Sequence, residues 1–229
     1  MQRVAKQWRL LPHDPAAIDR LARAARVPAI VSQVLLNRGI TDANQAQVFL
    51  QSPLTGMHPP EKLPGASEAA DRIWQAVQAK KRICIYVDYD ADGITGTSIL
   101  LQVLTRLGAV VDYYLPNRLE EGYGLNVQAL GELAAAGTDV VVTVDCGIAS
   151  LEEAVEARRL GMTLIVTDHH EFKSELPDAE VLVHPRLPES QYPFGGLSGA
   201  GVAFKLAWLI GTRASGGPKV DTQDRRAHV

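Results

Sequence analysis

Three aspartates at alternate positions, Asp88, Asp90 and Asp92, have the types and spacing best suited to chemistry in this chain. They follow a short apolar run of strand character and stand directly before a pattern typical of a helix. Like charges this close repel one another, and a bound cation relieves the repulsion. The sequence therefore predicts a metal or phosphate site at the carboxyl end of a strand, where α/β sheets usually hold their ligands.

Two other interpretations of this motif are a solvated acidic turn and the opening of an EF-hand calcium loop. An EF-hand needs a glutamate at its twelfth position and a helix in front. Here the twelfth residue is Ile99 and a strand leads in. The sequence excludes an EF-hand, and the acidic turn stays open as the alternative to a metal site.

Two later segments also end a strand pattern with metal-ligating side chains. Asp145 follows one apolar run, and Asp168, His169 and His170 follow the next. A lone aspartate there usually caps a helix or a turn, whereas a histidine pair after an aspartate, at the same edge as four other carboxylates, is typical of a metal site. Carboxylates with imidazoles favour Mn²⁺ or Mg²⁺, and the sequence has no cysteine set of the zinc type.

Short links between strand and helix patterns predict a mainly parallel α/β sheet flanked by helices from residue 83 onward. Glycines at the helix C′ positions and a capping box of Ser150 with Glu153 support the helices. The expected strands are 83–87, 110–115, 139–144, 163–167 and 181–183, and the expected helices are 95–107, 126–136, 150–160 and 202–210.

Three regions are expected along the chain. Short helical patterns interrupted by prolines predict a helical N-terminal extension over residues 1–65. An α/β catalytic domain is expected over 66–210. The tail, residues 211–229, has Gly-Gly-Pro and mixed charges without periodicity, so it is expected to be disordered or non-native.

Composition sets limits on the class of protein. The chain has 229 residues, 46% of them hydrophobic, and a net charge of −3, so any nucleic-acid contact must come from a local patch. We find no secretory core and no membrane span in the sequence, and we expect a cytoplasmic protein. The two cysteines, Cys84 and Cys146, suit buried thiols better than a disulfide.

The three motifs DYDADG, VDCG and DHH, in this order, resemble the DHH phosphoesterase family. Within it the chain is similar to the RecJ-type single-strand exonucleases. That similarity rests on the segments PNRLEEGYGL at 116–125, HPR at 184–186 and GGLSGAGVAFKLA at 195–207, and on a helical region ahead of the sheet. The resemblance covers about residues 1–210.

The resemblance implies a pair of bound ions, Mn²⁺ or Mg²⁺. Asp90, Asp92, Asp145 and His169 are expected to hold the ions, and Asp88 to lie in their first or second coordination shell. His170 is expected to orient the scissile phosphate or to carry a proton. Many RecJ-like chains have a histidine where this chain has Tyr86.

Two loops are candidates for substrate binding. Arg118, Tyr123 and Gly124 combine a cation, an aromatic ring and flexible backbone, which suits a phosphate and a stacked base, although an ordinary polar loop is the alternative. Gly199 and Gly201 precede the last expected helix, whose N-terminal amides could hold an anion, with Arg186 adding charge.

The resemblance implies a 5′ to 3′ exonuclease on single-stranded DNA in repair and recombination, with a single-strand-binding protein and a helicase as partners and no membrane. The alternatives are a DHH phosphoesterase for small substrates and an inactive nucleic-acid-binding fragment. The family's fourth motif places an aspartate roughly sixty residues after the histidine pair, beyond Val229. We therefore expect a truncated or frame-shifted product with weak nuclease activity.

Overall fold

The computed structural model describes residues 10–52, 56–117, 122, 124–172 and 174–217. The chain separates into two compact units, Met1–Met57 and His58–Val229. The sequence places the division at residue 65, whereas in the structure the short 3-10 helix η2 (Pro60–Lys62) packs against α4 and α8 of the second unit.

Among its described residues, the first unit has three short helices, α1 (Pro15–Ala25), α2 (Ala29–Asn37) and α3 (Ala43–Gln51). Aspartate side chains cap two of them, because Asp14 and Asp42 each accept hydrogen bonds from two amides of the following turn. The helices enclose a small apolar core of Leu21, Ala25, Leu35 and Ala46.

The second unit is built on a five-stranded sheet in the order β2-β1-β3-β4-β5, and every pair is parallel. This confirms the predicted fold class. The strands are β1 (Arg82–Val87), β2 (Val110–Tyr114), β3 (Val140–Val144), β4 (Thr163–Thr167) and β5 (Val181–Val183). The helices are α4 (Ala66–Gln78), α5 (Ala91–Arg106), α6 (Val127–Ala135), α7 (Leu151–Arg159) and α8 (Gly199–Ala214).

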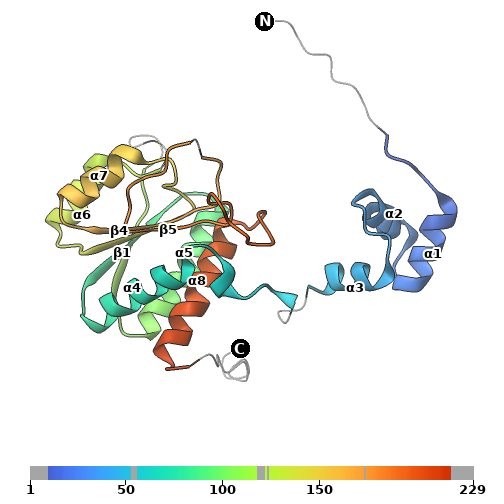
Figure 1. Cartoon of the computed structure of the whole chain (residues 1–229), viewed down its shortest axis with the longest axis horizontal. Helices are drawn as coiled ribbons and strands as arrows, with labels where there is room; N and C mark the ends of the chain where they lie inside the picture. The colour runs from blue at the N-terminus through green and yellow to red at the C-terminus, as the bar shows by residue number, and fades with distance from the viewer. Residues whose placement is uncertain (1–9, 53–55, 118–121, 123, 173, 218–229) are drawn as a thin grey trace, which may run out of the picture. The chain divides into compact units, whose positions relative to one another are not determined.

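Helices cover both faces of the sheet, with α4, α5 and α8 on one face and α6 and α7 on the other (Figure 1). Side chains alternate between the two faces along each strand. On β1, Ile83, Ile85 and Val87 enter the larger core, while Tyr86 enters the smaller one beneath α6 and α7. The central strands β1 and β3 are buried on both faces, as their apolar sequences predict.

Two helices differ from their predicted bounds by more than one residue at an end. Helix α5 begins at Ala91 rather than residue 95, because the Asp90 side chain accepts from the amides of Asp92 and Gly93 and so starts the helix earlier. Helix α8 runs from Gly199 to Ala214, past the predicted start of the tail at 211. The rest of that predicted tail, from residue 218, lies outside the described residues.

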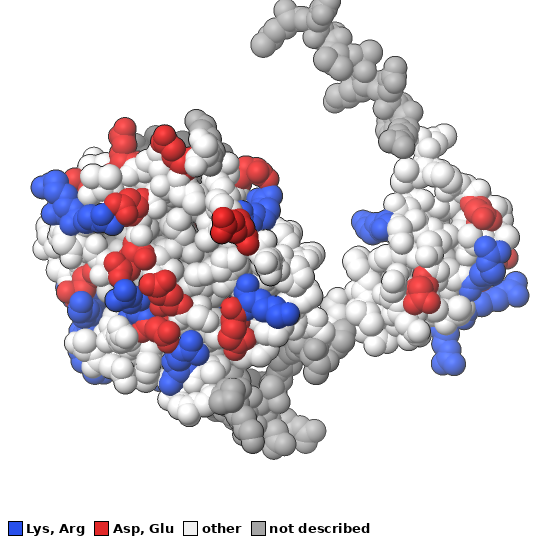
Figure 2. Space-filling view, viewed as in Figure 1, with Lys and Arg blue, Asp and Glu red and all other residues white. Residues whose placement is uncertain are grey.

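The surface of the second unit carries both signs of charge. Figure 2 shows Lys and Arg interspersed with Asp and Glu over the face in view. This mixture agrees with the net charge of −3 and gives no broad positive field on that face. None of the helices in the described part of the chain has the length and apolar character needed to cross a bilayer.

Candidate metal centre

The aspartates that end the strands extend the backbone ladder at the carboxyl edge of the sheet. The amide of Asp88 donates to the carbonyl of Val144 at 3.2 Å, and the amide of Asp145 donates to that of Thr167 at 3.0 Å. Parallel pairing therefore fixes the backbone of these residues side by side, at the edge where such sheets hold ligands.

Two sets of possible metal ligands meet at this edge and share Asp145. One set is Asp145, His169 and His170, the other is Asp88, Asp90 and Asp145, and within each set one ligand atom per residue lies within 4.8 Å of the others. The predicted gathering of these side chains at one edge is confirmed. Carboxylate oxygens with two imidazoles, and three carboxylates, are donor sets that fit Mn²⁺ or Mg²⁺. Because Asp145 belongs to both, the two positions are adjacent.

Asp145 is the buried centre of the site, with 1% of its surface exposed. Its φ is 66°, a left-handed conformation that Asp and Asn adopt more readily than most residues. Burial, followed by the nearby charges of Asp92 and Asp90, raises its pKa to about 7. Its Oδ1 lies 3.0 Å from His169 Nε2. A carboxylate held in this way favours a cation beside it.

Asp92 joins the metal motif to α8. Its Oδ2 accepts from the amide of Gly199 and its Oδ1 from that of Ala200, both at 2.7 Å. Burial by itself would raise its pKa, but these hydrogen bonds outweigh burial and lower the pKa. Oδ2 also lies 3.6 Å from His169 Nε2. Asp92 therefore faces the cluster without being part of either three-residue set.

Gly199 allows α8 to approach the buried carboxylate. A Cβ at this position would overlap the Asp145 carboxylate and lie 2.7 Å from Asp145 Cβ, so a side chain does not fit. The sequence assigned Gly199 and Gly201 to anion binding through their amides. The structure corrects this, because the Gly199 amide binds Asp92 and the Gly201 amide binds the Ser198 hydroxyl.

The sequence places Asp168 in the metal motif without a role of its own, and the structure shows that it organises the histidine pair. Its Oδ1 accepts from the amides of His169 and His170 and lies 2.8 Å from His170 Nδ1, while its Oδ2 accepts from the Ile148 amide. Burial alone would lower the pKa of His170, but the hydrogen bond and charge of Asp168 outweigh it and raise the pKa. The position of Asp168 at a strand end, as the first residue of the DHH triplet, is the sequence feature that indicates this role.

His184 and Arg186 support the DHH triplet from its carbonyl side. His184 is fully buried; its Nδ1 accepts from the Arg186 amide at 3.0 Å, so its Nε2 carries the proton and donates to the His170 carbonyl at 2.9 Å. The Arg186 guanidinium donates to the His169 carbonyl and pairs with Glu171. Arg186, predicted to bind substrate, is thus engaged by groups of the chain itself.

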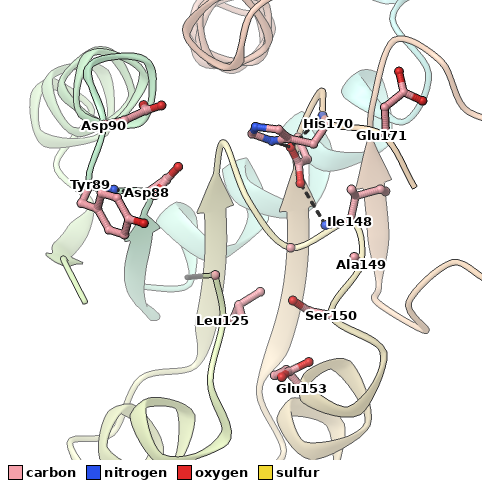
Figure 3. A pocket seen from close by; sticks show the side chains of 13 residues that line it. Asp88, Tyr89, Asp90, Leu125, Ile148, Ala149, Ser150, Glu153, His170 and Glu171 are labelled. Atoms are coloured by element: carbon pink, nitrogen blue, oxygen red, sulfur yellow. Dashed lines mark hydrogen bonds and ion pairs between the residues drawn. The ribbon is translucent and has the colours of Figure 1, made fainter. Parts of the chain in front are cut away.

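A pocket of about 860 Å³ lies next to the cluster, and Figure 3 shows Asp88, Asp90 and His170 around one end of it. Gly124, predicted to bind substrate, is part of its wall. Arg118 and Tyr123, predicted with it, lie outside the described residues. Tyr86 is buried and donates to the Gly124 carbonyl at 3.1 Å, so this tyrosine supports the wall.

Comparison with known proteins identifies the family. Residues 82–225 match the model of the DHH family, N-terminal domain. The chain belongs to the DHH family. It is also 43% identical, over 204 residues, to the single-stranded-DNA-specific exonuclease RecJ of Bacillus subtilis (strain 168). The predicted resemblance is confirmed.

Solved structures of RecJ have the same fold. The structure of RecJ from Thermus thermophilus in complex with Mn²⁺ matches 93% of this chain and 29% of its own, with a TM-score of 0.70 and 33% identity. A RecJ structure bound to manganese matches 68% of this chain and 39% of its own, with a TM-score of 0.61 and 42% identity. The match to the B. subtilis protein covers 89% of this chain but only 26% of that protein.

Proposed function

We propose that this chain is the metal-binding part of a DHH phosphodiester hydrolase that acts on single-stranded DNA. The observation that carries the proposal is the pair of ligand sets that share Asp145, because two adjacent cations are what phosphodiester cleavage by a two-metal site requires. The RecJ structures with manganese and the RecJ exonuclease sequences support the same reaction class.

The roles of the side chains follow from their positions. Asp88, Asp90 and Asp145 would hold one ion, while Asp145, His169 and His170 would hold the other. When bound, Mn²⁺ or Mg²⁺ activates water and stabilises the charge that develops in an in-line displacement at phosphorus.

The remaining groups position this cluster. Asp92 accepts from the first amides of α8 and faces His169. It therefore helps to position the His169 ring and adds negative charge beside the two metal ions. Asp168 orients the His170 ring, which lines the pocket. We assign to His170 the orientation of the scissile phosphate or the transfer of a proton to the leaving oxygen.

The finer parts of the proposal concern the cellular role. We propose a 5′ to 3′ polarity, a function in repair and recombination, a cytoplasmic location, and work alongside a helicase and a single-strand-binding protein; the likeness to single-stranded-DNA-specific exonucleases supports these roles. A helicase would supply single strands and a binding protein would keep them open, so both suit an enzyme of this kind.

The test measures release of mononucleotides from a 5′-phosphorylated single-stranded oligonucleotide with Mn²⁺. Asp145→Asn should abolish the activity. Asp139→Asn is a matched control, since Asp139 precedes the same strand at the opposite edge of the sheet and is exposed. Equal rates for Asp145→Asn and the unmodified chain would refute the proposed site, and cleavage of small phosphoesters alone would favour the small-substrate alternative.

A further inference from the structure

The pocket beside the metal centre extends to the start of α7, where two polar side chains line it. Ser150 and Glu153 occupy the part of the pocket away from Asp90 and His170 (Figure 3). The sequence predicts that this pair forms a capping box. The structure shows no side-chain cap at Ser150, and within the described part of the chain neither side chain has a hydrogen-bond or ion-pair partner.

We propose that this end of the pocket binds the base of the terminal nucleotide, with Glu153 accepting a hydrogen bond from the base and Ser150 adding a second polar contact. The inference rests on the proposed function, because the metal cluster at the other end would hold the phosphate. The volume of about 860 Å³ falls in the range of pockets that enclose small ligands and accommodates one nucleotide.

Charge assigns the two ends of the pocket to different parts of a nucleotide. An anionic Glu153 repels phosphate, so the phosphate belongs beside the cations and the uncharged base beside the glutamate. Between them the wall includes the apolar side chains of Leu125, Ile148 and Ala149, which suit the faces of a sugar and a base.

A carboxylate at this position also suits an enzyme that digests any sequence. It can only accept hydrogen bonds, and each of the four bases offers at least one N–H donor on its Watson–Crick edge. Glu153 would therefore hold the base without selecting among the four. An acidic residue in the first turn of α7 also stabilises the helix through its dipole. The exposed neighbour Glu152 lies in the same turn and has the same effect on the helix.

That neighbour supplies the matched control. With Mn²⁺ present, calorimetry measures the binding of dCMP and of deoxyribose 5-phosphate, which lacks the base, to the unmodified chain, Glu153→Ala and Glu152→Ala. Glu153→Ala should weaken dCMP binding about tenfold or more, the effect of losing a hydrogen bond to a charged group. Binding of deoxyribose 5-phosphate should change less than twofold, and Glu152→Ala should leave both ligands unchanged.

Unchanged dCMP binding in Glu153→Ala, or equal weakening of both ligands, would overturn the base site. Glu153→Gln guards against misfolding, because it keeps the size and an acceptor oxygen and should lose only part of the dCMP affinity. A different result would refute the proposed function itself. If the metal cluster does not hold the phosphate, deoxyribose 5-phosphate would bind the unmodified chain equally with and without Mn²⁺.

Discussion

Replacing Asp145 by Asn should change how the stability of the metal-free protein depends on pH. Asn has nearly the same shape and also adopts the left-handed conformation that this position requires, with φ at 66°. The substitution therefore removes the charge of a side chain that is 1% exposed while leaving the backbone conformation accessible. The resulting change in stability reports on the buried charge.

The size of the effect comes from the pKa of this carboxyl, which burial raises from 3.8 to about 7. A group whose pKa is raised by folding contributes stability that is fully present below pH 3.8 and is lost as the pH rises to about 7. At 1.36 kcal/mol per unit, the full loss is about 4 kcal/mol, and the part between pH 5 and pH 8 is about 3 kcal/mol. The free energy of unfolding of a domain rarely exceeds about 15 kcal/mol, so a change of this size is a large fraction of the total.

Other groups of the cluster contribute to the pH dependence of the unmodified protein. The raised pKa values of Asp88 and His170 act in the same direction as Asp145, and the lowered pKa values of Asp92 and His184 act in the opposite direction. The comparison between the unmodified chain and Asp145→Asn reports the contribution of Asp145 together with its coupling to His170, whose pKa is raised in part by the Asp145 charge.

The assay is urea unfolding in a chelator at pH 5 and pH 8, followed by the fluorescence of Trp74 and Trp208 in the α/β unit. Asp145→Asn should lose about 3 kcal/mol less than the unmodified chain between the two pH values, while Asp139→Asn should follow the unmodified chain. Parallel pH curves for Asp145→Asn and the unmodified chain would refute the reasoning that Asp145 is a buried, raised-pKa carboxyl.

Three further predictions concern the same centre. Millimolar Mn²⁺ should raise the melting temperature of the chain, and His169→Ala should reduce that shift while the exposed His13→Ala should not; an unchanged melting temperature of the folded chain would contradict the metal site. Gly199→Ala should destabilise the protein by about 1–3 kcal/mol, because the new methyl group overlaps the buried Asp145 carboxylate. Gly211 lies on the same helix with open space around it, so Gly211→Ala should stabilise the protein by up to about 1 kcal/mol. Equal urea midpoints for the two variants would contradict the close approach of α8 to Asp145. Asp168→Ala should cost about 3 kcal/mol in urea unfolding, because it leaves buried donors without an acceptor; a loss within error would show that water replaces it.

The sequence by itself determined which carboxylates and imidazoles gather at the carboxyl edge of the sheet. Apolar runs that end in Asp88, Asp145 and Asp168, joined by helices with glycine at their ends, permit little other than a parallel sheet, and parallel strands bring their carboxyl ends to one edge. Strand ends are local features of the chain, so the gathering of carboxylates and imidazoles could be predicted without coordinates.

Only the tertiary structure decided which contacts each of these residues makes. The contact between Asp92 and the first amides of α8 spans 107 positions of sequence, and no local pattern specifies it. That contact gave Gly199 a packing role against Asp145 in place of the predicted anion site. The motif of Ser150 and Glu153 likewise has the spacing of a capping box, but the chain enters α7 with φ −88° and ψ 71° at Ser150, and no cap bond forms. Long-range packing sets the conformation at such positions, because the free energy of burying an apolar helix such as α8 exceeds the preference of any single local motif.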